Sequence, residues 1–173
     1  MVFKEISQKL KDRAKKIKLI CFDVDGVLTN GDIFIGKEGE HFKQFSAFDG
    51  LGIRMAQQFG LETAIISARD SVFPHVRFKD LGMEEIHTAV ADKMAKLKEI
   101  QEKLGITMEQ TAFIGDDAVD ITVLEKVGLS GCPPEAHYSV FKHIHYITER
   151  GAGKGCAREF IDLVLYCQGN IPA

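Results

Sequence analysis

The stretch from Ile20 to Gly31, "ICFDVDGVLTNG", decides how this chain is expected to fold. The apolar run over residues 17–22, "IKLICF", is typical of a strand buried on both faces of a parallel sheet. Asp23 and Asp25 follow this run directly, and Gly26 allows the backbone a tight turn. The carboxyl ends of parallel strands line the ligand crevice of α/β proteins, so we expect both carboxylates at the mouth of a site.

Strands and helices alternate along the rest of the chain. "ETAIIS" and "TAFIGDD" predict two further buried strands, and shorter strands are expected at Ile86, "VGLSG" and "HYIT". Helices are predicted over residues 1–16, 49–59, 70–81, 93–104, 117–126 and 156–167, with Asp70 and Asp92 as N-caps of the third and fourth. This alternation predicts an α/β fold, a Rossmann-like three-layer parallel sheet within a single domain over residues 1–173.

One segment departs from that alternation. In "GDIFIGKEGEHFKQF" the apolar residues alternate with polar ones around a turn near Gly39, which predicts a β-hairpin inserted over residues 32–46. An apolar face made by this hairpin would need a partner to cover it. The residues expected on that face are Ile33, Ile35, Phe42 and Phe45.

The composition narrows the class of protein. The chain has 173 residues, of which 45% are hydrophobic, and a net charge of −3. It has no overall basic charge to favour nucleic acid and no apolar run of the roughly 20 residues that cross a bilayer. The four cysteines form no CxxC pair, which favours free thiols and a reducing compartment. We therefore expect a soluble cytoplasmic protein without a nucleic-acid or membrane partner.

Polar residues that close the predicted strands suggest a chemistry. Asp23, Asp25 and Asp116 offer hard oxygen ligands, which suit Mg²⁺. Ser67 and Lys93 could hold phosphoryl oxygens and offset the charge of a transition state. One aspartate could then attack phosphorus, while a second moves the proton of the leaving oxygen.

Four segments together resemble the motifs of the haloacid dehalogenase superfamily of phosphatases, in order: "DVDGVLT", "IISAR", Asp92-Lys93 and "IGDDAVD". The resemblance implies that Asp23 is the nucleophile and a metal ligand, and that Asp25 is the general acid/base and a ligand through its backbone carbonyl. It implies further roles for the third metal ligand Asp116, the phosphoryl-binding Ser67 and Lys93, and the supporting Asp117 and Asp120.

The spacing of these motifs points to the capless group of the superfamily. Roughly 40 residues separate Asp25 from Ser67 and about 25 separate Ser67 from Lys93, too few for a cap domain. Members of this group form homotetramers in which a neighbouring subunit covers the crevice. The resemblance thus implies a homo-oligomer, with the hairpin over residues 32–46 as its assembly element.

Within this group the chain is similar to the 3-deoxy-D-manno-octulosonate 8-phosphate (KDO 8-phosphate) phosphatase family of lipopolysaccharide biosynthesis. "DGLGIR", "EKVGLS" and "GAGKGCAREFIDLVLYCQGN" carry the likeness, whereas "SAR" replaces the usual "TGR" and Lys154 stands where arginine is usual. The resemblance implies that substrate contacts Asp25, Ser46, Ala47, Phe48, Asp49, Gly50, Arg54, Arg69, Arg77, Lys93 and Asp117.

Two alternative functions stay open from the sequence. One is a phosphatase for a nine-carbon sugar acid phosphate, such as KDN 9-phosphate or a sialic acid phosphate. The other is a phospho-accepting regulatory domain, in which the phosphorylated aspartate closes a middle strand. Ser67 closes the middle strand of this chain, which argues against the regulatory domain.

Overall fold

A six-stranded parallel sheet forms the centre of the molecule. The structure, a computed structural model, describes residues 6–172. The strands lie in the order β5-β4-β1-β6-β7-β8. In the central strand β1, Cys21 lies beside Ala64 of β4 on one side and Phe113 of β6 on the other. The bounds are β1 Leu19–Phe22, β4 Glu62–Ile66, β5 Glu85–His87, β6 Thr111–Ile114, β7 Leu129–Cys132 and β8 Tyr146–Ile147. The predicted three-layer α/β fold is confirmed.

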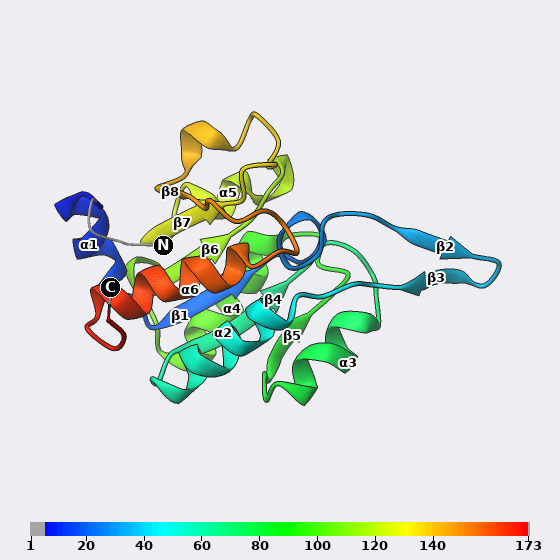
Figure 1. Ribbon diagram of the computed structural model, residues 1–173, viewed down its shortest axis with the longest axis horizontal. Helices are drawn as coiled ribbons and strands as arrows, with labels where there is room; N and C mark the ends of the chain where they lie inside the picture. Colours follow the sequence, from blue (N-terminus) through cyan, green and yellow to red (C-terminus); the bar gives the residue numbers. More distant parts are fainter. Residues whose placement is uncertain (1–5, 173) are drawn as a thin grey trace.

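Helices cover both faces of this sheet (Figure 1). A separate hydrophobic core lies between the helices and the sheet on each face. Because side chains alternate along a strand, Ile20 and Phe22 of β1 enter one core, while Leu19 and Cys21 enter the other. The first core contains residues of α1 (Gln8–Ala14), α2 (Ala47–Gln58), α3 (Phe73–Asp80) and α6 (Cys156–Cys167). The second contains residues of α4 (Lys93–Leu104) and α5 (Ile121–Leu124).

The fourth predicted helix has both of its predicted ends. Asp92 accepts a hydrogen bond from the Ala95 amide at 3.0 Å, and Gly105 ends α4 in the left-handed conformation. Leu97 and Ile100 face the core. This capping fixes the first residue of the helix, Lys93, at the carboxyl edge of the sheet.

Two other helices differ from their predictions. Asp70 caps no helix: α3 begins at Phe73, and Val72 at its N-cap makes no side-chain bond. Pro74 and Phe78 are the buried residues of this helix, whereas Val76 is exposed. The helix predicted over residues 117–126 is divided into a single turn, η4 (Ala118–Asp120), and the short α5.

The hairpin of β2 (Phe34–Gly36) and β3 (Gly39–Phe42) projects from the body of the molecule (Figure 1). Its rings stack, Phe34 on Phe42, with centroids 4.2 Å apart, and Ile35 is 68% exposed. Phe45, expected on the same apolar face, instead packs edge-on against Phe78 of α3 at 5.2 Å. The exposed part of the apolar face is therefore confined to the projecting hairpin.

The ends of the chain bear on two expectations. Of the helix predicted over residues 1–16, residues 8–14 form α1, while Met1 to Glu5 lie outside the described residues, as does Ala173. In the described part of the chain, no helix is long and apolar enough to cross a membrane.

Candidate active site

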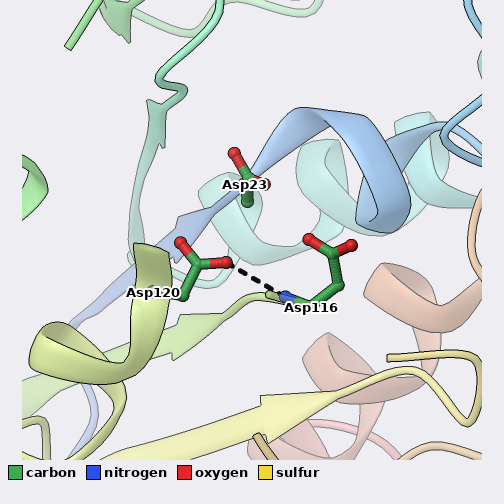
Figure 2. A group of neighbouring side chains, drawn as sticks. All are labelled: Asp23, Asp116 and Asp120. Atoms are coloured by element: carbon green, nitrogen blue, oxygen red, sulfur yellow. Dashed lines mark hydrogen bonds between the residues drawn. The ribbon is translucent and has the colours of Figure 1, made fainter. Parts of the chain in front are cut away.

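Three carboxylates meet at the carboxyl edge of the sheet. Asp23 follows β1, Asp116 follows β6 by two residues, and Asp120 closes η4. An oxygen of each lies within 4.8 Å of the others, and Figure 2 shows the three side chains gathered around one point. Parallel strands deliver these residues to the same edge, as predicted for Asp23 and Asp116.

Lys93 supplies the positive charge of this group. Its ammonium lies 2.8 Å from Asp23 Oδ1 and 2.6 Å from Asp120 Oδ1, and the residue is 4% exposed. Burial favours the neutral amine, but Asp23 and Asp120 outweigh it and raise the pKa of Lys93. We call Asp23, Lys93, Asp116 and Asp120 the inner cluster.

Asp120 holds this cluster together. Its Oδ2 accepts the backbone amides of Asp116 at 3.1 Å and Asp117 at 3.4 Å, while its Oδ1 binds Lys93. The side chain is fully buried, so its charge is balanced by these donors alone. Asp120 thereby fixes both the lysine and the loop that carries Asp116. Figure 2 shows its bond to the Asp116 amide.

The inner cluster carries more negative than positive charge. Burial and the neighbouring Asp120 raise the pKa of Asp23 to about 6, against the opposing effect of Lys93. Burial, Asp23 and Asp120 raise the pKa of Asp116 to about 8. A divalent cation between Asp23 and Asp116 would relieve this repulsion.

The residues present fit Mg²⁺. Carboxylate oxygens are the ligands it prefers, and the described part of the chain places no cysteine or histidine among the three clustered carboxylates. Gly26 keeps the space open: its φ is +86°, and a Cβ there would lie 2.0 Å from Asp116 Oδ2. Asp23, Asp116 and the backbone carbonyl of Asp25 are the groups that would hold the ion.

The carboxylate of Asp25 belongs to a second group of charges. It forms an ion pair with Lys43, just beyond β3, and lies 3.9 Å from Arg69 Nε. Glu40 of β3 binds Lys43 Nζ at 2.9 Å and Arg69 Nε at 3.3 Å, and accepts from Ser71 Oγ at 2.5 Å. We call Asp25, Glu40, Lys43, Arg69 and Ser71 the outer cluster.

The sequence did not predict Glu40, Lys43 or Ser71 as site residues. Burial alone would raise the pKa of Glu40, but the hydrogen bonds from Ser71 and Lys43 outweigh burial and lower this pKa. The spacing of Glu40 and Lys43 did not indicate that they would meet, because side chains three residues apart on a regular strand point to opposite faces. The pairing of β2 with β3 shifts register between Phe34 and Ile35, which adds one residue to β3 between Glu40 and Phe42, and Lys43 lies just beyond the end of β3.

The predicted substrate loop, residues 46–50, forms the start of α2. Ser46 caps this helix by accepting from the Phe48 amide at 3.2 Å, and Ala47 is exposed. Phe48 is 58% exposed beneath the guanidinium of Arg150, 5.2 Å from its ring centroid. Asp49 is buried, and its Oδ1 accepts from the Arg158 amide at 2.8 Å, which ties α2 to the first turn of α6.

The remaining predicted site residues lie in different places. Arg69 belongs to the outer cluster, whereas Arg54 donates to the Asp80 carbonyl of α3 at 3.1 Å. Arg77 also lies between α2 and α3, where a Cβ on Gly50 would meet its guanidinium at 2.4 Å. The structure thus places one of the three predicted arginines beside Asp25. Ser67 is buried directly after β4, and Asp117 caps η4 at the Ala118 amide.

Comparisons with known proteins agree with this geometry. A family model for haloacid dehalogenase-like hydrolases matches residues 63–160. The chain is 37% identical over 166 residues to the 3-deoxy-D-manno-octulosonate 8-phosphate phosphatase KdsC of Escherichia coli K12, covering 96% of this chain and 88% of that protein.

Solved structures share the whole fold. A probable YrbI family phosphatase from Pseudomonas syringae has 42% identity and a TM-score of 0.92, covering 95% of this chain and 94% of that one. The KDO 8-phosphate phosphatase of Moraxella catarrhalis, solved with magnesium, phosphate and KDO, has 35% identity and a TM-score of 0.92, covering 95% of each chain. The chain belongs to the haloacid dehalogenase-like hydrolases, and within them it is similar to the KDO 8-phosphate phosphatases.

Proposed function

We propose that this protein is a Mg²⁺-dependent phosphomonoesterase that hydrolyses KDO 8-phosphate to KDO and phosphate. The observation that carries the proposal is the inner cluster, in which a buried lysine and a buried aspartate hold Asp23 beside a second carboxylate. The likeness to KDO 8-phosphate phosphatases over nearly the whole chain supports the choice of substrate.

In the first step Asp23 attacks phosphorus. An oxygen of its carboxylate forms a bond to phosphorus as the ester oxygen of the sugar departs with the bonding electrons. Asp25 gives its proton to that oxygen, so the sugar leaves as an alcohol. Lys93 and Ser67 hold phosphoryl oxygens, and Lys93 balances their charge. Mg²⁺, when bound, neutralises negative charge on the phosphoryl group and on Asp23.

In the second step water releases the phosphate. Asp25, now ionised, takes a proton from a water molecule, whose oxygen attacks the phosphorus of the aspartyl phosphate. The bond between phosphorus and Asp23 breaks, and both carboxyl groups return to their starting states. Asp120, with no exposed surface, serves only to keep Lys93 and the Asp116 loop in place.

The choice of substrate is tested by comparing kcat/KM over a panel of phosphate esters. The panel contains KDO 8-phosphate, a nine-carbon sugar acid phosphate and a neutral hexose phosphate. We expect KDO 8-phosphate to be preferred, because Arg69 beside Asp25 can bind the carboxylate of a sugar acid. A hundred-fold preference for the hexose phosphate would contradict the proposal, and a preference for the nine-carbon ester would redirect it.

We further propose that the protein acts in the cytoplasm as a homotetramer assembled through the hairpin. Four large apolar residues on this arm are between 37% and 68% exposed, namely Ile33, Phe34, Ile35 and Phe42. Such a surface calls for a covering partner. Light scattering should give a tetramer, and Ile35→Glu should lower the mass. An active wild-type monomer would contradict this assembly.

A further inference from the structure

We propose that the hairpin has a second role: Lys43, held by Glu40, positions the carboxylate of Asp25 for proton transfer to the leaving group. Lys43 is thus a positioning residue, and the base of the hairpin completes the active site of its own subunit. The inference rests on the proposed role of Asp25 as general acid and base.

The first observation that supports this inference is the burial of the Lys43 side chain. Its side chain is 1% exposed although it follows a hairpin whose tip is open to water. Burying an ammonium without partners is costly, so its two carboxylate partners, Asp25 and Glu40, account for its position. A lysine that served only solubility or assembly of the arm would keep its charge in water.

Glu40 holds Lys43 and Arg69 in place independently of Asp25. It binds Lys43 and Arg69, and Ser71 donates to its second oxygen. These bonds hold both cations in place whether or not Asp25 carries a proton. The carboxylate of Asp25 therefore meets a fixed pair of donors, Lys43 on Oδ1 and Arg69 near Oδ2.

Orientation is what a general acid needs from its surroundings. Proton transfer requires the carboxyl oxygen to lie within hydrogen-bond reach of the leaving oxygen, and a misplaced group loses much of its effect. The inner cluster offers no hydrogen bond to the Asp25 side chain among the described residues; besides the outer cluster, only Thr29 reaches it, at 3.4 Å. Lys43 at the base of the hairpin, together with Arg69, is consequently the main source of its orientation.

The test compares two leaving groups. Protonation matters greatly for an alkyl sugar phosphate and little for p-nitrophenyl phosphate, whose phenolate leaves readily. We expect Lys43→Met to lower kcat/KM, which reports only the steps up to departure of the leaving group, at least about 10-fold more for the best alkyl sugar phosphate than for p-nitrophenyl phosphate. Lys43→Arg should restore most of the lost kcat/KM.

The controls separate positioning from folding. Lys37→Met removes an exposed cation from the same hairpin and should leave both substrates unaffected. Glu40→Gln keeps the shape of the residue that anchors Lys43, so it should produce a smaller selective loss even if Lys43→Met folds poorly. An equal loss on both substrates in Lys43→Met and Glu40→Gln, or no loss in either, would overturn the inference.

The same assay tests the underlying role of Asp25. Asp25→Asn should show the largest selective loss on the alkyl ester. If Asp25→Asn lowers kcat/KM equally for both esters, the proposed general acid is wrong. If Asp25→Asn is selective and Lys43→Met is not, only the positioning role of Lys43 is wrong.

Discussion

The inner and outer clusters lie on either side of one short turn, yet they are built differently. The inner cluster takes its residues from strand ends and capped helical turns of the parallel sheet. The outer cluster depends on the path of a hairpin that projects from the body, because Glu40 lies on β3 of this hairpin and Lys43 directly follows β3. We infer that the sheet supplies the groups that hold phosphorus, while the hairpin aims the group that moves the proton.

The largest effect should come from the inner cluster. Asp23→Asn removes the attacking oxygen and should lower kcat about 10⁴-fold or more for every phosphate ester, whatever its leaving group. Phosphate release with each ester measures this loss. A loss of activity confined to alkyl esters would mean that Asp23 acts on the leaving group, as proposed for Asp25, and would contradict the proposed division of roles between the two clusters.

Lys93→Met should be the next most severe change. It leaves Asp23 and Asp120 buried without their cation, so we expect a loss of about 3–5 kcal/mol in the free energy of unfolding. kcat should fall about 10²-fold or more, because the phosphoryl group loses a charged donor. Urea unfolding and steady-state kinetics measure both, with Lys98→Met, an exposed lysine of the same helix, as the control. Wild-type stability in Lys93→Met would contradict the described pairing.

The two clusters differ in how far the sequence could predict them. Asp23, Ser67, Lys93 and Asp116 were predictable because strand ends and the cap at Asp92 fix their place in any parallel sheet. The outer cluster was not, since regular strand alternation would separate Glu40 from Lys43, and the sequence did not indicate the register shift between the two strands of the hairpin.

Long-range packing limited the prediction elsewhere as well. Asp49 was predicted to contact substrate, but nothing in its neighbours along the chain indicated that it would bind the Arg158 amide of α6. Similarly, Phe45 joins the core because Phe78 of α3 is beside it, a contact between residues far apart in sequence. Such contacts depend on how separate elements meet, which local patterns do not encode.

Metal-free protein should become less stable as the pH rises. The raised pKa values of Asp23, about 6, and Asp116, about 8, mean that the folded state holds more protons than the unfolded chain above about pH 4. Stability is then lost as pH rises toward the folded pKa values, by about 3 kcal/mol between pH 6 and pH 8. Urea unfolding in EDTA measures this slope, which Asp116→Asn should flatten and Mg²⁺ should offset. A stability that rises with pH in EDTA would contradict the charge balance of the inner cluster.

The smallest effect should come from the edge of the outer cluster. Ser71→Ala removes one hydrogen bond to Glu40 and should cost about 1 kcal/mol in the free energy of unfolding. Mg²⁺ affinity, a property of the inner cluster, should stay unchanged. Urea unfolding and a Mg²⁺ titration check this pair of results. A tenfold weaker Mg²⁺ affinity would show that the two clusters act as one.

The most direct test of the central claim is to trap the phosphoryl group on the protein. Enzyme in excess over KDO 8-phosphate, with Mg²⁺, is quenched in acid within the first turnover, and the peptides are analysed by mass spectrometry. We predict one phosphoryl group on the peptide that contains Asp23, and none in Asp23→Asn. Phosphate release at the wild-type rate with no phosphorylated peptide, or with the group on another residue, would contradict Asp23 as the nucleophile.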